Sequence, residues 1–416
     1  MSNDVTNKRG SKATIAIVLV TFLFFAWGLT MNLVNALNTP MANYMEISAT
    51  KASLLQMAYF GAYFFLAIPA SIVAKKHGYK VGIMMGLALF VIGSLLTIPA
   101  TSSMNYNLFL LAMFITASGA ATLETNCNPY ITKLGDPEKE AFRLNLAQSF
   151  NGVGNIVGPF ILGSVIGETL NPGDAGFEQA KASFLDGTKT IYIGIAIALA
   201  IVLAIFFFVK LPTPPGDEEA NEENTGGIKK LFEIPHFALG VLAAFIFIGL
   251  QVGGMALFSS YSLEHWEGMS AGTATKYLGI VSLLFTVGRF VTTPLMSKFK
   301  PNKILGVYMS LSAILMVIVA LGLGKVSVIA FIISYLFISI GFPTIYSLSL
   351  VGLTGNDAKT GASILTMSIV GAAIIPVIMS AIGDKTSLQV AMGVTVIGFI
   401  YCAWYGFVGS KKGLEA

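Results

Sequence analysis

The chain has 416 residues, of which 55% are hydrophobic and only 11% are charged. A soluble domain carries about 25% charged residues, so this composition excludes an ordinary soluble protein and indicates a polytopic membrane protein. The formal net charge of +4 gives no reason to expect a nucleic-acid partner. Cys127 and Cys402 both lie in apolar runs, which does not support a disulfide framework, and the three histidines lack metal-ligand spacing.

Twelve apolar runs have the length of about 20 residues that crosses a bilayer as a helix. The first six lie near residues 13–37, 52–74, 81–100, 107–132, 144–168 and 190–210. The second six lie near residues 236–262, 273–297, 304–324, 327–352, 361–382 and 388–410. Runs this long exclude membrane-barrel strands of about ten residues, so we predict an all-α membrane protein with twelve transmembrane helices. The first run is too long for the apolar region of a signal peptide, and we expect no cleaved leader.

Lysine and arginine residues gather on one side of this predicted topology. When the N-terminus is placed in the cytoplasm, Arg289 falls within a span and all but six of the other basic residues fall on the cytoplasmic side. Positively charged loops stay in the cytoplasm, so we expect both termini to be cytoplasmic. The six basic residues on the outer side are Lys51, Lys181, Lys189, Lys276, Lys325 and Lys385.

Residues 211–230 form the one clear linker. They are rich in proline, glycine and acidic residues and show no apolar periodicity, which predicts a flexible cytoplasmic connection. The linker separates an N-terminal six-helix half at 13–210 from a C-terminal half at 231–410. Short cytoplasmic tails remain at 1–12 and 411–416.

The two halves resemble each other faintly. Residues 154–159 in the fifth run parallel residues 371–376 in the eleventh, with glycine first and proline last in both. Pro129 and Pro343 occupy matching places in the fourth and tenth runs. These matches support two pseudo-symmetric six-helix halves, the layout expected of a major facilitator transporter that holds its substrate between the halves.

Glu124 places a carboxylate inside the fourth apolar run. A carboxylate at that depth costs about 3 kcal/mol on insertion scales, and such a group usually faces a wet cavity where protonation or ion pairing is part of the function. Asn128 and the helix-interrupting Pro129 follow closely. The alternative is a glutamate near a helix end that snorkels to the interface. We interpret Glu124 as the ion-coupling residue of a transport site, with Pro129 in a structural role.

Amide side chains are the other candidates for this site. Asn32 and Asn35 in the first run, and Gln148 and Asn151 in the fifth, are each three residues apart and so lie on one helix face. Buried amides need partners, and a polyhydroxy ligand offers donors and acceptors. The alternative is hydrogen bonding between helices. The candidate substrate contacts are Asn32, Asn128, Gln148, Asn151, Gln251 and Tyr346.

Two further features concern gating and packing. Arg289 lies toward the cytoplasmic side of the eighth run, where snorkelling or a gate contact with the opposite half is favoured over substrate binding. The Gly-x-x-x-Gly-Pro pattern at 154–159 is similar to a motif of drug antiporters, but small residues at this spacing also let helices approach closely. We favour the packing interpretation. No basic cluster lines the spans, so a neutral polar solute fits better than an anionic one.

The runs Leu-Glu-Thr-Asn-Cys-Asn-Pro at 123–129, Phe-Arg-Leu-Asn-Leu-Ala-Gln-Ser-Phe-Asn at 142–151 and Pro-Thr-Ile-Tyr-Ser-Leu at 343–348 together resemble the bacterial L-fucose–proton symporter family. That family includes glucose/galactose and N-acetylglucosamine permeases. The resemblance implies a major facilitator fold in the bacterial inner membrane and cation-coupled import of a monosaccharide such as glucose, galactose, fucose or N-acetylglucosamine. By the family's pattern, Glu124 would couple ion and sugar, and Gln148 and Asn151 would contact sugar.

One departure from that family lies in the first run, where the fucose symporter has an Asn-Asp pair and this chain has Val34 and Asn35. An amide takes up no proton, so a relay of two carboxylates is not available. Burial favours the protonated form of Glu124, which would allow one carboxylate to couple proton transport. Alternatively, Glu124 and amide oxygens of Asn32, Asn35 or Asn128 would form a Na+ site. The sequence leaves both open.

The sequence therefore predicts a monomeric symporter whose partners are a sugar and the lipid bilayer, with no cofactor beyond the coupling ion, Na+ or H+. An enzyme would need a nucleophile and base, or metal ligands, within the spans, and no such arrangement of histidine or cysteine is found. A proton-coupled drug or metabolite exporter is the alternative, supported only by the pattern at 154–159.

Overall fold

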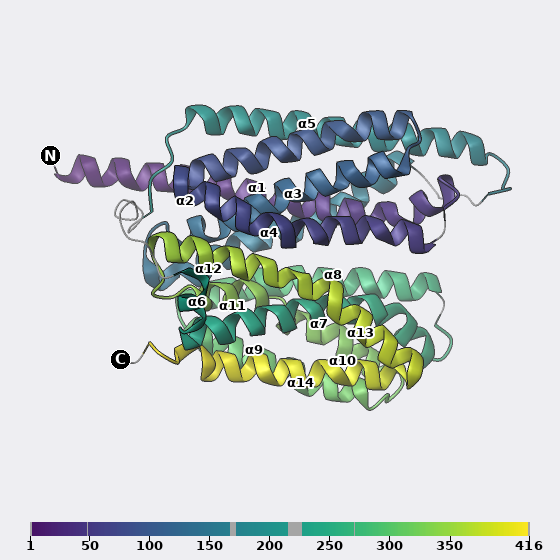
Figure 1. The fold of residues 1–416 in the computed structure, drawn as a ribbon. Helices are drawn as coiled ribbons and strands as arrows, with labels where there is room; N and C mark the ends of the chain where they lie inside the picture. Colours follow the sequence, from purple (N-terminus) through teal and green to yellow (C-terminus); the bar gives the residue numbers. More distant parts are fainter. Residues whose placement is uncertain (1, 48, 167–171, 215–226, 270, 415–416) are drawn as a thin grey trace. The chain divides into compact units, whose positions relative to one another are not determined.

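The computed structural model describes the whole chain except residues 1, 48, 167–171, 215–226, 270 and 415–416. Every regular element in this described part is a helix (Figure 1). The helices before residue 215 are α1 (Ser2–Tyr44), α2 (Ala49–Ser102), α3 (Tyr106–Lys133), the 3-10 turn η1 (Pro137–Lys139), α4 (Glu140–Ile166) and α5 (Phe177–Phe208). Those that follow are α6 (Gly227–Phe232), α7 (Pro235–His265), α8 (Ala271–Thr292), η2 (Thr293–Ser297), α9 (Pro301–Ala320), α10 (Lys325–Ile338), α11 (Gly341–Ser349), α12 (Gly355–Met367), η3 (Ser368–Val370), α13 (Gly371–Lys385), α14 (Leu388–Phe407) and η4 (Gly409–Lys411).

Ten segments of the described residues are long and apolar enough to cross a membrane. One of them, Met57–Ser102, holds two predicted spans, because α2 is broken at Gly78. The backbone there has φ 83° and ψ 165°, a region open essentially to glycine alone. Helix α4 is not among the ten, yet its 27 residues are enough to span a bilayer. The twelve predicted transmembrane helices are therefore present.

Two predicted spans of the second half are interrupted rather than continuous. The span at 327–352 corresponds to α10 and α11, which part at Ser339 and Ile340. Pro343 has no N–H, so it cannot pair with the carbonyl of Ser339 as an ordinary helical residue would. The span at 361–382 corresponds to α12, η3 and α13. Such breaks free backbone carbonyls to accept hydrogen bonds from side chains.

The chain divides into two compact units. The first comprises Met1–Tyr130 and Phe150–Pro214, and the second comprises Ile131–Ser149 and Pro215–Ala416. The turn between α3 and α4 therefore packs with the helices of the second unit, although it belongs by sequence to the first half. Most of the predicted linker lies outside the described residues, and α6 begins at its end.

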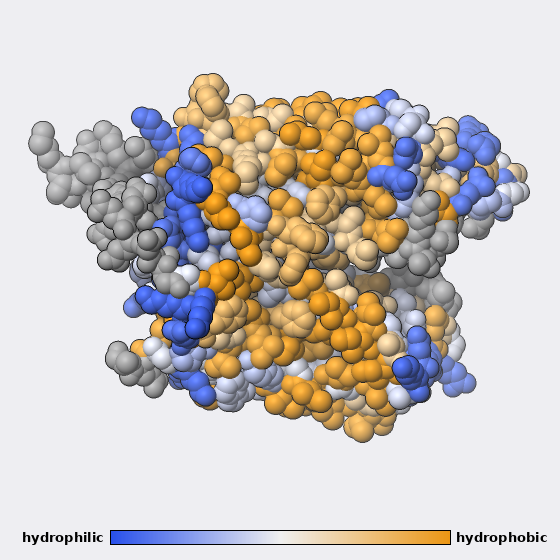
Figure 2. Space-filling model, in the orientation of Figure 1, coloured by the Kyte–Doolittle hydropathy of each residue, from blue (hydrophilic) through white to orange (hydrophobic). Residues whose placement is uncertain are grey.

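Within each unit, long helices pack side by side and expose apolar outer faces. In the first unit α5 lies along α2, and in the second α14 lies along α9. Hydrophobic residues cover the middle of these helices and hydrophilic residues gather at their ends (Figure 2). Phe160, Phe207 and Phe208 are 75%, 64% and 82% exposed. Exposed aromatic rings of this kind are suited to contact with lipid.

Candidate functional site

Glu124 lies on α3 in the first unit and is only 6% exposed. The polar side chains that interact with its carboxyl are Tyr63 of α2 and Asn128, one turn further along α3. Among the described residues no lysine, arginine or histidine forms an ion pair with Glu124. The carboxyl is thus buried among neutral polar groups, which stabilise a neutral acid more readily than a carboxylate.

A second tyrosine extends this polar cluster. Tyr59 lies one helical turn before Tyr63, and their ring centroids are 5.8 Å apart. Both rings are 2% exposed. The Tyr59 hydroxyl and both amide atoms of Asn128 are buried with no hydrogen-bonding partner in the described part of the chain. Asn128 therefore interacts with Glu124 without a hydrogen bond of standard geometry. Unsatisfied buried polar groups are uncommon and mark places where a water, ion or substrate group can bind.

A separate chain of amides connects α1 and α4 in the first unit. Asn32 Nδ2 donates to the carbonyl of Asn155 over 2.6 Å. Asn155 Nδ2 donates to Oδ1 of Asn151 over 3.2 Å, and Asn151 Nδ2 donates to the carbonyl of Phe24 over 3.1 Å. Two predicted substrate residues are thus linked through Asn155, which the sequence analysis did not single out. Its spacing of four from Asn151 is the signal that could have identified it.

Glycines bring α1 and α4 close enough for this amide chain to form. A Cβ added at Gly154 would meet the carbonyl oxygen of Phe25, and one added at Gly158 would meet that of Leu29. From the other helix, a Cβ at Gly28 would meet the backbone and side chain of Asn151. Only a hydrogen fits at these three places. The glycine pattern at 154–158 therefore serves helix packing, as the sequence analysis favoured.

Arg289 lies on α8 in the second unit and is 5% exposed. Its Nε donates to the carbonyl of Ser339 over 2.8 Å, and its Nη1 donates to the carbonyl of Gln148 over 2.7 Å. The guanidinium carbon lies 4.8 Å from the ring centroid of Phe285. The Ser339 carbonyl is the one that Pro343 leaves without a helical donor. Arg289 thus joins three elements, α8, the α10–α11 break and the beginning of α4.

Side chains near the α3–α4 turn make further bonds within the second unit. Asn145 Nδ2 donates to the Thr344 hydroxyl over 3.1 Å. Lys133 Nζ lies 3.1 Å from Glu140 Oε1 and 3.4 Å from the carbonyl of Leu350. Phe142, Tyr308 and four buried apolar residues form one hydrophobic cluster that includes Ala141, Met296, Ile304 and Ile340. The turn is therefore held by both polar and apolar contacts.

Arg143 fixes the shape of that turn. Its guanidinium donates to the carbonyls of Ile131, Thr132 and Asp136. Burial lowers the pKa of Arg143, and the nearby Glu140 and Asp136 oppose that effect. Two backbone carbonyls at the end of α3 and one in the following turn are thus satisfied by one planar donor group.

The remaining predicted residues lie in different surroundings. The Gln148 side chain is 6% exposed on α4, and its backbone carbonyl is occupied by Arg289. Gln251 on α7 is half-buried and accepts from the Tyr335 hydroxyl at its backbone carbonyl over 2.6 Å. Tyr346 on α11 is fully buried beside Phe342, with ring centroids 5.8 Å apart. The side chain of Asn35 lies outside the described part, and Pro129 lies inside α3.

A family model described as the Major Facilitator Superfamily matches residues 18–356. The chain belongs to this superfamily. It is 34% identical to the glucose/galactose transporter of Brucella abortus, over 95% of this chain and 94% of that one. It is 35% identical to the L-fucose-proton symporter of Escherichia coli, over 89% of this chain and 87% of that one.

A solved structure agrees with these relatives. The crystal structure of the Escherichia coli fucose:proton symporter matches with a TM-score of 0.85 and 32% identity, covering 95% of this chain and 98% of that one. As a member of the Major Facilitator Superfamily, the chain is a multi-pass membrane transporter and not an enzyme. The predicted family and fold are confirmed by these matches.

Proposed function

We propose that this transporter imports a neutral monosaccharide together with a proton by alternating access, as a monomer in the bacterial inner membrane with both termini in the cytoplasm. The relatives named as a glucose/galactose transporter and an L-fucose-proton symporter support the substrate class and the coupling. The uneven distribution of lysine and arginine supports the orientation. The observation that carries the proposal is Glu124, a buried carboxyl without an ionic partner among the described residues.

Glu124 is the proposed proton-coupling residue. A carboxylate buried among Tyr63 and Asn128 is costly until something neutralises it, and a proton does so without further ligands. A sodium ion would need several oxygen ligands in addition. Asn32 is a candidate sodium ligand. Its amide N–H donates to the backbone carbonyl of Asn155, which ties the Asn32 side chain to helix packing. Proton coupling therefore needs fewer groups than sodium coupling does.

The sugar contacts are proposed from the amides and tyrosines of the spans. A planar amide can donate to one hydroxyl and accept from its neighbour, so amides recognise polyhydroxy ligands. Asn128 is the strongest of these candidates, because neither of its amide atoms has a hydrogen-bonding partner of standard geometry in the described part of the chain. The full proposed set remains Asn32, Asn128, Gln148, Asn151, Gln251 and Tyr346.

One proton per sugar follows from the count of acidic residues. Apart from Glu168 at the last position of the fifth span, Glu124 is the only aspartate or glutamate within the twelve predicted spans. Import of one neutral sugar would then carry one positive charge. A membrane potential of 100 mV supplies about 2.3 kcal/mol per charge, which limits accumulation to about 50-fold when no pH gradient is present. A higher steady-state ratio at that potential would contradict this stoichiometry.

The test is uptake of labelled glucose, galactose, fucose and N-acetylglucosamine into proteoliposomes, under an imposed pH gradient or an imposed Na+ gradient separately. We expect accumulation of at least one sugar with the pH gradient alone. Accumulation driven by Na+ alone would overturn proton coupling. No uptake of any sugar under either gradient would overturn the import proposal and favour the exporter.

The variant Glu124→Gln assigns the coupling residue. Glutamine mimics the neutral acid, so we expect this variant to exchange sugar across the membrane but to lose uphill accumulation. Glu178→Gln, which removes an exposed carboxylate in the first turn of α5, is the matched control and should accumulate normally. Loss of all sugar binding in Glu124→Gln, or unchanged accumulation, would contradict the assignment.

A further inference from the structure

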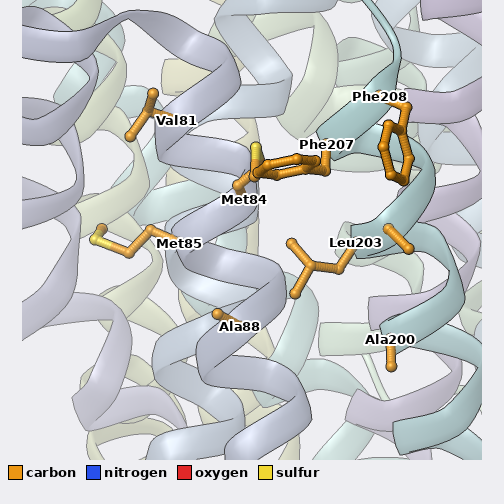
Figure 3. Close-up of a pocket in the computed structure, with 9 residues that line it drawn as sticks. Val81, Met84, Met85, Ala88, Ala200, Leu203, Phe207 and Phe208 are labelled. Carbon is orange, nitrogen blue, oxygen red and sulfur yellow. The ribbon is translucent and has the colours of Figure 1, made fainter.

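An apolar groove lies between α2 and α5 in the first unit. Its volume is about 650 Å³, and its lining includes Met84, Met85, Ala88, Ala200, Leu203 and Phe207 (Figure 3). Alanines make the groove hollow, because their short side chains leave the space between the two helices unfilled. Methionine side chains adapt their shape to irregular apolar neighbours. The lining is therefore suited to a flexible hydrocarbon.

The groove opens on a lipid-facing part of the molecule. Its residues Phe207 and Phe208 are 64% and 82% exposed, and their rings meet edge to face at the end of α5. The helices on both sides are membrane-spanning segments with a continuous hydrophobic surface (Figure 2). An acyl chain of the bilayer can therefore reach the groove without crossing the protein.

Lysines stand at one end of this groove. Lys80 directly precedes Val81, which lines the groove, and its Nζ donates to the carbonyl of Phe207 over 3.0 Å. Lys210 follows two residues after Phe208 and is exposed. An ammonium has three N–H donors, so the Phe207 carbonyl leaves two of those on Lys80 for another acceptor. The groove thus combines an apolar trough with a positively charged end.

We propose that this groove binds an anionic phospholipid of the leaflet on the Lys80 side, which is the cytoplasmic leaflet in the proposed topology. One acyl chain lies against the alanines and methionines, and the phosphate accepts hydrogen bonds from Lys80 and Lys210. The apolar chain by itself gives little selectivity, because bulk lipid tails offer it surroundings that are equally apolar. The lysines supply the selectivity, since basic residues at the membrane surface attract anionic headgroups.

The test compares phosphatidylglycerol with phosphatidylethanolamine of the same acyl chains, added to the delipidated full chain and counted as bound lipids by native mass spectrometry. The variant Lys80→Gln/Lys210→Gln removes the charge. The variant Ala200→Leu/Ala204→Leu fills the groove at two exposed positions of α5, where larger side chains disturb no buried packing. We expect the wild type to prefer phosphatidylglycerol and both variants to lose that preference. Each lysine should contribute about fivefold, which corresponds to about 1 kcal/mol.

A matched control removes two lysines from the second half of the chain, at and just after the turn between η2 and α9. Lys298→Gln/Lys303→Gln lowers the charge equally at exposed positions outside this groove, and it should keep the preference. If this control loses the preference for phosphatidylglycerol to the same extent, the preference depends only on net charge and the proposal is overturned. Unchanged lipid binding in the two groove variants would overturn it also. If native mass spectrometry shows a dimer in the wild type and a monomer in Ala200→Leu/Ala204→Leu, the groove binds a second copy of the chain instead of a lipid.

Discussion

Arg289 and Pro343 should be energetically coupled through one backbone carbonyl. Pro343 has no N–H to pair with the carbonyl of Ser339, and Arg289 Nε donates to that oxygen over 2.8 Å. Arg289→Met removes the donor while keeping a long apolar side chain. Pro343→Ala restores an N–H at the position that pairs with Ser339 in a continuous helix. The two substitutions together test whether Arg289 acts by satisfying this carbonyl.

The magnitude follows from the cost of a buried acceptor without a partner, about 1–3 kcal/mol. In the wild-type background, Arg289→Met leaves the Ser339 carbonyl in that state. In the Pro343→Ala background the carbonyl has a new donor, so this part of the cost is absent. Desolvation of the guanidinium and its bond to Gln148 contribute equally in both backgrounds and cancel in the double-mutant cycle. We expect a coupling energy of about 1–3 kcal/mol.

The assay is the free energy of unfolding of the four proteins, measured by SDS titration in mixed detergent micelles. Arg143→Met is the control for Arg289→Met, because Arg143 is bonded to the carbonyls of Ile131, Thr132 and Asp136 and should show no coupling to Pro343. A coupling below about 0.5 kcal/mol, which is the usual scatter of independent sites, would refute the reasoning.

Three further predictions follow from single contacts. Tyr63→Phe removes the hydroxyl that interacts with Glu124, the proposed coupling residue. Sugar exchange should persist while the pH dependence of proton-driven uptake shifts. An unchanged pH profile would leave Tyr63 a packing residue. Gly154→Ala should lower the free energy of unfolding by about 1–3 kcal/mol, because the added Cβ meets a backbone carbonyl of α1. Gly194→Ala, whose Cβ has nothing within 4 Å, should be neutral or slightly stabilising. Equal effects of the two substitutions would contradict the close approach of α1 and α4 at Gly154. Burial raises the pKa of Glu140, and the nearby Lys133 opposes that effect. The folded state therefore binds the Glu140 proton more tightly than the unfolded state does. The free energy of unfolding should fall as the pH rises from the ordinary pKa of Glu140 to the raised one. Thermal unfolding against pH should show that fall in the wild type and not in Glu140→Gln.

The sequence predicted the number of spans because a membrane helix must bury about 20 apolar residues, and that length appears directly in the residue order. It did not predict every break in the helices. The break of α2 at Gly78 falls between the predicted spans 52–74 and 81–100, whereas Ser339 separates α10 from α11 inside a run that stays apolar. A hydropathy pattern records the cost of polar side chains and carries no record of backbone dihedral angles.

The candidate site was predicted unevenly for a similar reason. Glu124 was identified because a charge in an apolar run is conspicuous by its cost. Tyr59 and Tyr63 were missed, since tyrosines are ordinary packing residues of apolar helices. Their spacing of four places both on one face of α2, and that could have indicated a shared partner. Contacts from a different helix, such as Tyr63 to Glu124, depend on tertiary packing that no local pattern specifies.

The polar groups of the first unit fall into two kinds, and the difference supports the proposed distinction between packing residues and transport residues. Asn32, Asn151 and Asn155 satisfy one another and nearby carbonyls, so the folded chain already offsets the cost of burying them. The Tyr59 hydroxyl and the Asn128 amide, beside Glu124, have no such partners in the described part. Their burial is costly until a proton, water or sugar hydroxyl arrives. A transporter needs that imbalance, because a site fully satisfied when empty would gain nothing from loading.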